Sequence, residues 1–197
     1  MNRFRKWASL LVLLTLMLAL TVSAGAEHEV NSFSFTHFAS GGIQEELPAI
    51  ILMENKNSTF TKYQVAFPSC TCRDAASNYW SVMYVELLNT KDTRAEAAVR
   101  SVSFGYNNKD VRVGLWGDSD PIMGHPEYTS DYMDENFVQK LVGVTKADVD
   151  SWDGYGTQLD AVDVDAVSGA TVSTSNITSV LRSLFAYHCD RYYGDKE

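Results

Sequence analysis

The chain has 197 residues, with 25 acidic and 16 basic side chains, 45% hydrophobic residues and only four prolines. A hydrophobic content near the globular average, combined with little proline, excludes a disordered or fibrous protein. The length predicts one folded domain with a tail.

The first 26 residues have the pattern of a cleavable secretory signal. Three basic residues precede an apolar run over residues 8–22, and the small residues Ala24-Gly25-Ala26 follow where a signal peptidase needs them. The run is shorter than the roughly 20 residues that span a bilayer. We therefore expect a secreted, extracytoplasmic protein, which would stay at a membrane only if the signal were uncleaved.

Beyond this signal peptide the charge is strongly negative. Residues 27–197 keep 13 basic and 25 acidic side chains, a net charge of −12. This excess disfavours nucleic acid and anionic lipid surfaces as partners.

Residues 27–62 are polar and irregular, and only the run over residues 48–53 predicts a strand. We expect residues 27–78 to form an N-terminal extension that packs on a core made by residues 79–197.

Strand signals begin at residue 79. A β-rich stretch covers residues 79–87, and residues 97–104 and 111–116 alternate around a polar turn at 105–110. This pattern predicts antiparallel strands. A further brief strand is expected over residues 159–164.

Helical patterns follow. Residues 130–143 predict a helix that Ser130 or Asp131 caps and Gly143 ends, and a second short helix is expected over residues 145–152. The clearest signal is the last helix, which extends to about Tyr192 and is capped by Ser173 or Thr174. Its apolar residues recur at helical spacing: Ile177, Val180, Leu181, Leu184, Phe185 and His188. The fold class predicted is α+β, an antiparallel sheet packed against the C-terminal helix.

Cysteine is scarce. Cys70, Cys72 and Cys189 are too few for a disulfide-stapled scaffold, and no second Cys/His pair at ligand spacing completes a metal site. In an oxidising exterior the favoured alternative is a disulfide from Cys189 to Cys70 or Cys72.

The segment before the last helix carries the chemistry. Residues 165–171 read Asp-Ala-Val-Ser-Gly-Ala-Thr, which places small and hydroxyl residues just ahead of a helix N-terminus. Free backbone N–H groups and the positive end of the helix dipole favour an anion there, such as a phosphate.

The order D-x-x-S-G-A-T in this segment resembles the flavinylation signature of the FMN-binding domain family. Its best-known members are covalent-flavin subunits of the sodium-pumping NADH:quinone reductase and of Rnf-type complexes. The resemblance implies that residues 79–197 are an FMN-binding domain and that a helical segment precedes its motif. It also implies that Thr171 bonds to FMN through a phosphoester made by a flavin transferase that uses FAD and a divalent metal.

The resemblance gives roles to further residues. Ser168, Gly169 and Ala170 would shape the turn that holds the phosphate, and Asp165 would be recognised by the transferase. Ser173 and Thr174 are the next candidates for attachment. The family has an upstream segment that contacts the flavin, and its nearest counterpart here lies around residue 125, where the residue order differs. The candidate flavin contacts in this segment are His125, Glu127, Tyr128 and Thr129. The alternative is that the segment is an ordinary loop. Trp116 could stack on the ring, although an aromatic residue in a strand is more often part of the core.

Two other classes compete with this interpretation. A hydrolase would use the loop Gly117-Asp118-Ser119-Asp120 with His37, His125 or His188 as the base, but G-x-S-x-G is absent. His188 is more typical of a packed or hydrogen-bonded core histidine. A noncovalent FMN or phosphate-ligand binding module, or a sensor, would use the same anion-friendly turn reversibly.

No G-x-G-x-x-G follows a strand, so direct oxidation of NAD(P)H is not expected. The sequence predicts an electron-transfer flavoprotein with redox partner proteins rather than a self-contained enzyme.

Overall fold

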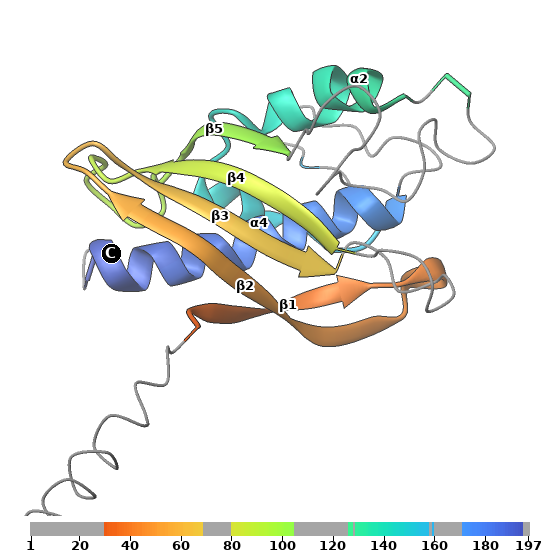
Figure 1. Ribbon diagram of the computed structural model, residues 1–197, viewed down its shortest axis with the longest axis horizontal. Helices are drawn as coiled ribbons and strands as arrows, with labels where there is room; N and C mark the ends of the chain where they lie inside the picture. Colours follow the sequence, from red (N-terminus) through yellow and green to blue (C-terminus); the bar gives the residue numbers. More distant parts are fainter. Residues whose placement is uncertain are drawn as a thin grey trace, which may run out of the picture. The chain divides into compact units, whose positions relative to one another are not determined.

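A five-stranded antiparallel sheet, with strands in chain order, is the centre of the structure (Figure 1). The computed structural model describes residues 30–68, 80–104, 126–127, 129–157, 159 and 171–194. Residues 31–197 cluster as one compact unit. The strands are β1 Ser32–Phe38, β2 Gln44–Lys56, β3 Phe60–Pro68, β4 Trp80–Leu88 and β5 Val99–Phe104.

Alternation along each strand sends apolar side chains to one face of the sheet. Tyr63, Val65 and Phe67 of β3 are buried on this inner face, and Met83, Val85 and Leu87 of β4 lie beside them. Two tight turns fix the register. The β1–β2 turn holds η1 (Ser40–Gly42), whose two glycines have positive φ, and Asn57 Oδ1 accepts from the Thr59 and Phe60 N–H groups in the β2–β3 turn.

A β-bulge in β2 changes which side chains face inward. The register shifts between Ile51 and Met53, so that Leu52 and Met53 are both exposed and Glu54 points to the inner face opposite Tyr63. There the Glu54 carboxylate accepts hydrogen bonds from the hydroxyls of Tyr187 and Tyr192.

Helix α4 (Thr171–Tyr192) runs across the inner face of the sheet (Figure 1). The six apolar-face residues expected from the sequence are all buried: Ile177, Val180, Leu181, Leu184, Phe185 and His188. Burial of each large apolar side chain contributes about 1.5–3 kcal/mol relative to exposure. The predicted α+β class, with an antiparallel sheet against a C-terminal helix, is confirmed. Among the described residues no helix is long and apolar enough to cross a membrane.

The helical segment before the motif is also confirmed. It is a continuous series of α2 (Ser130–Met133), η2 (Asp134–Val138) and η3 (Gln139–Leu141), and Gly143 ends it with a φ of 92°. The expected cap at Ser130 or Asp131 is wrong by one or two residues, because the Thr129 hydroxyl accepts from the Tyr132 N–H at 3.2 Å. Next comes α3 (Lys146–Ser151), where Thr145 and Asp148 form a capping box.

The N-terminal part differs from expectation. Residues 32–68 form three consecutive strands where the sequence predicts a mostly irregular extension, and β3 pairs with β4 along its whole length. The sheet therefore continues across the expected boundary at residue 78. Of the other expected strands, β5 is present, Leu159 lies in a single bridge, and residues 111–116 and 160–164 lie outside the described residues.

Candidate functional site

Thr171 is the first described residue of α4. It and the next two residues, Val172 and Ser173, are half-buried, and no acidic side chain lies in this first turn. The first four N–H groups of a helix have no partner within the helix, and the positive end of the macrodipole adds to their attraction for negative charge. The surroundings of the Thr171 hydroxyl therefore suit an anionic group.

Most of the motif lies outside the described residues. Asp165, Ser168, Gly169 and Ala170 lie outside the described residues. Ser173 lies within the first helical turn, so the expected cap at Ser173 or Thr174 is wrong by at least two residues. The Thr174 hydroxyl instead donates to the Thr171 carbonyl at 3.3 Å, inside the helix.

The loop after α3 packs against the start of α4. The Gly156 N–H donates to Ser175 Oγ at 3.2 Å, and Gly156 has a φ of 74° that favours glycine. A Cβ at Gly156 would lie 3.5 Å from Thr171 Cγ2, so this loop is in van der Waals reach of Thr171. The loop is held by its own bonds, since Thr157 N–H and Oγ1 both donate to the Gly154 carbonyl.

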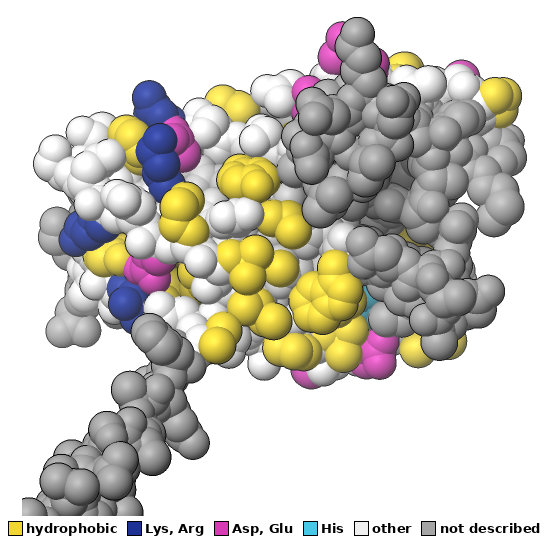
Figure 2. Space-filling model, in the orientation of Figure 1, with side chains coloured by type: hydrophobic (Ala, Val, Ile, Leu, Met, Phe, Trp, Pro, Cys, Tyr) yellow, Lys and Arg dark blue, Asp and Glu magenta, His cyan; other side chains and the backbone are white. Residues whose placement is uncertain are grey.

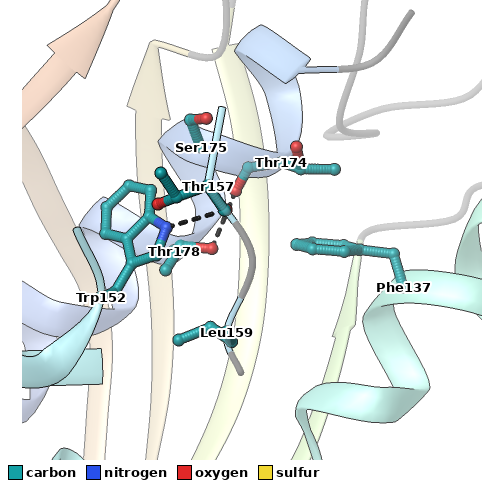
Figure 3. Close-up of a pocket in the computed structure, with 7 residues that line it drawn as sticks. All are labelled: Phe137, Trp152, Thr157, Leu159, Thr174, Ser175 and Thr178. Atoms are coloured by element: carbon teal, nitrogen blue, oxygen red, sulfur yellow. Dashed lines mark hydrogen bonds between the residues drawn. The ribbon is translucent and has the colours of Figure 1, made fainter. Parts of the chain in front are cut away.

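A small pocket lies between this loop and the first two turns of α4 (Figure 3). Phe137 of η2 reaches toward α4 from the opposite side, and Trp152 Nε1 donates to the Thr157 carbonyl at 3.1 Å. The lining residues are Phe137, Trp152, Thr157, Leu159, Thr174, Ser175 and Thr178. Its cavity volume is about 10 Å³, room for about one water molecule and far below the ~300–1,000 Å³ of ordinary ligand pockets.

Two side chains, the buried Asn176 and the partly buried Arg182, fix α4 beside the sheet and the loop. Asn176 accepts from the Phe38 N–H at 2.7 Å and donates to the Phe38 carbonyl at 2.9 Å, which ties the helix to the end of β1. Arg182 donates to the carbonyls of Val149 and Trp152 at the end of α3, and its guanidinium lies 5.1 Å from the centre of the Trp152 ring. The start of α4 is therefore rigidly placed.

The upstream candidates are only partly described. Glu127 and Thr129 are exposed, and Thr129 caps α2. His125, Tyr128 and Trp116 lie outside the described residues. Sequence reasoning missed Phe137, Trp152 and Thr157 as neighbours of the motif. The signal available for Trp152 and Thr157 was their place in a Gly-rich loop directly before the motif.

Of the three histidines considered for a hydrolase, His188 and His37 lie in the described residues, and their surroundings differ. His188 is buried and bonded to Tyr63 and to the Leu88 carbonyl, as expected for a core histidine. His37 is also buried; its Nδ1 lies 3.2 Å from Glu45 Oε1, but neither ring nitrogen has hydrogen-bond geometry to a partner among the described residues. Burial lowers the pKa of His37 more than Glu45 raises it. Residues 117–120 lie outside the described residues.

Cys189 is buried, and its Sγ lies 3.7 Å from the Arg94 carbonyl oxygen. The two cysteines predicted as its disulfide partners lie outside the described residues, so the pairing stays a prediction. Within the described part of the chain, no group of His, Cys, Asp and Glu side chains is arranged to hold a metal ion.

Comparisons of the chain with protein-family models, with curated proteins and with solved structures found no match.

Proposed function

We propose that this protein is an exported flavoprotein that carries FMN covalently on Thr171 through a phosphoester and relays electrons between protein partners or to an extracellular acceptor. The observation that carries the proposal is the D-x-x-S-G-A-T order, with its closing threonine as the first residue of a 22-residue helix.

The surroundings of Thr171 suit the phosphate end of the cofactor. The half-buried threonine leaves its hydroxyl within reach of a modifying enzyme, and the first helical turn offers N–H donors without a competing carboxylate. A threonine hydroxyl is a poor nucleophile at neutral pH. The base and metal that activate it would come from a flavin transferase, so Thr171 is a substrate of modification and not a catalyst.

The ring end would stay open to partners. As the described residues line it, the pocket beside Thr171 is too small to enclose an isoalloxazine, although Trp152 and Phe137 give it apolar walls. A bound flavin supplies one-electron and two-electron redox chemistry, and the protein's part is to bind, orient and shield it. A tethered flavin with an open face suits electron exchange with another protein better than chemistry on a small enclosed substrate.

The decisive experiment is co-expression with a flavin transferase. The protein should become yellow, fluoresce on a denaturing gel and yield a peptide containing Thr171 that carries one FMN phosphoester. Thr171→Val should abolish the label. Thr174→Val, on the next turn of the same helix, is the matched control and should keep it.

Other outcomes have defined meanings. A label that survives Thr171→Val would contradict the assignment and direct attention to Ser173 or Thr174. Flavin that is bound but released on denaturation would instead support the alternative of a noncovalent FMN-binding or sensor module.

A further inference from the structure

The face of the sheet opposite α4 carries an apolar surface among the described residues, which we call the open face. The pairing Ile50–Ala66–Val82 across β2, β3 and β4 forms its central row. Further residues extend this surface along the strands: Pro48, Leu52, Met53, Pro68, Trp80 and Tyr84.

Large hydrophobic side chains on the open face are well exposed. Leu52 is 54% exposed, Trp80 43%, Met53 40% and Tyr84 39%. Figure 2 shows hydrophobic side chains gathered over the middle of this face. Contiguous apolar patches of this kind mark interaction sites more often than scattered single residues do.

The two ends of the open face carry different charges. At the β1–β2 end, Glu46 is exposed and accepts from the Thr36 hydroxyl. At the β2–β3 end, Lys62 and Arg100 flank the less exposed Glu86, so this end has a net positive charge. In Figure 2 the Lys and Arg side chains lie on the left of the apolar area, with acidic side chains among them, and further acidic side chains lie at its lower right.

We propose that the open face binds a second copy of this chain, in a symmetric dimer whose twofold axis lies between the two sheets and crosses the strands. Such an interface is isologous, because the same surface serves both copies. The axis reverses the strand direction, and the acidic end of one copy then lies over the basic end of the other.

The register supports this axis. The midpoint of β2 between Glu46 and Asn55 falls between Ile50, on the central apolar row of the open face, and Ile51, which is buried on the inner face. A twofold axis there places Glu46 of one copy over Asn55 of the other, and Asn55 pairs with Lys62. The same twofold rotation therefore places apolar residues over apolar residues and the acidic end of one copy over the basic end of the other.

The size of the face predicts a weak dimer. Nine residues of β4 extend roughly 30 Å and five strands roughly 20 Å, which limits the contact to about 600 Å² per copy. Stable interfaces bury about 800 Å² per partner. We therefore expect monomer and dimer to exchange with concentration. The interface leaves α4 and Thr171 on the opposite face, so the dimer does not depend on the proposed flavin.

Sedimentation velocity of the purified protein over a range of concentrations tests the proposal. Tyr84→Glu places a charge on the open face and should raise the dimer dissociation constant by at least about tenfold. Tyr132→Glu on α2, where the tyrosine is equally exposed at 39%, is the matched control and should change it less than about twofold. Circular dichroism checks that both variants keep their fold.

Exchanging two opposite charges distinguishes a contact between the two copies from an effect within a single copy. Glu46→Lys and Lys62→Glu should each weaken the dimer, and the double variant should restore it. Within one copy the two residues are roughly 30 Å apart along the sheet, so they cannot compensate each other there. A protein that stays monomeric at every concentration, equal effects of Tyr84→Glu and Tyr132→Glu, or a double variant no better than its parents would overturn the proposal.

Discussion

His188 shows how one buried side chain acquires a fixed protonation state. The Leu88 carbonyl can only accept a hydrogen bond, so Nε2, 3.3 Å away, carries the proton and Nδ1 accepts from the Tyr63 hydroxyl at 2.9 Å. Burial lowers the pKa of His188 from 6.5 to about 4, and burial together with the nearby Glu54 raises that of Tyr63. The pair is neutral at physiological pH.

This pKa predicts that acid destabilises the fold. An unfolded His188 binds a proton near pH 6.5, whereas the folded one resists it down to about pH 4. The free energy of unfolding should therefore fall as the pH drops between these values, by up to about 3 kcal/mol from this residue. Urea unfolding at several pH values should show a shallower fall for His188→Gln. An identical pH profile for the variant would contradict the assignment.

Asn176 links helix and sheet through two buried hydrogen bonds. Asn176→Ala would leave the buried N–H and carbonyl of Phe38 without their partner, and should lower the free energy of unfolding by about 2–4 kcal/mol. Asn136→Ala removes an exposed amide bonded to the Tyr132 carbonyl, and should cost less than about 1 kcal/mol. Denaturant titration measures both. Similar losses in the two variants would show that the link to β1 is unimportant.

At the scale of elements, Arg182 joins α4 to the end of α3 and to the loop beside Thr171. A lysine cannot reproduce its planar fork of donors, so Arg182→Lys should lower the free energy of unfolding by about 1–3 kcal/mol and shift Trp152 fluorescence. Arg100→Lys, at an exposed ion pair with Glu86, should cost less than about 1 kcal/mol. Unchanged stability and fluorescence in Arg182→Lys would remove this residue from the site's support.

The sequence predicts well those elements in which packing against one neighbouring element determines which positions are apolar. α4 has its buried apolar residues at helical spacing, and β4 alternates cleanly. β1 also alternates, through Phe33, Phe35 and His37, and β3 does so through Tyr63, Val65 and Phe67. The polar residues between these positions led to the prediction of an irregular segment. Period-2 spacing was the signal for both.

Other features could not be read from the sequence. The run Ile50-Ile51-Leu52-Met53 is apolar throughout, so its pattern does not show which residues face inward. Only the bulge turns Glu54 toward the tyrosines of α4. The start of α4 was misplaced because its serines and threonines resemble caps, whereas Thr174 and Thr178 bond to carbonyls within the helix. The pocket depends on contacts between distant segments, which no local pattern contains.

At the scale of the whole molecule, the N-terminal pattern predicts export. N-terminal sequencing of the protein recovered outside the producing cell should begin at Glu27, because Ala24-Gly25-Ala26 supplies the small residues for cleavage. Met1 retained in a membrane fraction would contradict this prediction.

The charge of the molecule bears on how electrons would reach and leave it. A net charge of −12 over residues 27–197 favours encounter with basic surfaces on a redox partner. Added salt shortens the Debye length from about 10 Å at 0.1 M to about 3 Å at 1 M. The rate of electron transfer between the flavinylated protein and a basic partner should therefore fall as ionic strength rises.

Stopped-flow reduction of the flavinylated protein measures this salt dependence and separates a carrier from an enzyme. A partner reductase or a chemical reductant should reduce it quickly, and NADH alone slowly or not at all, because the chain has no nicotinamide-binding G-x-G-x-x-G after a strand. The flavin-free Thr171→Val variant is the control and should transfer no electrons. Rapid, saturable NADH oxidation by the purified protein, or full activity toward a small substrate in Thr171→Val, would identify an enzyme in place of a carrier.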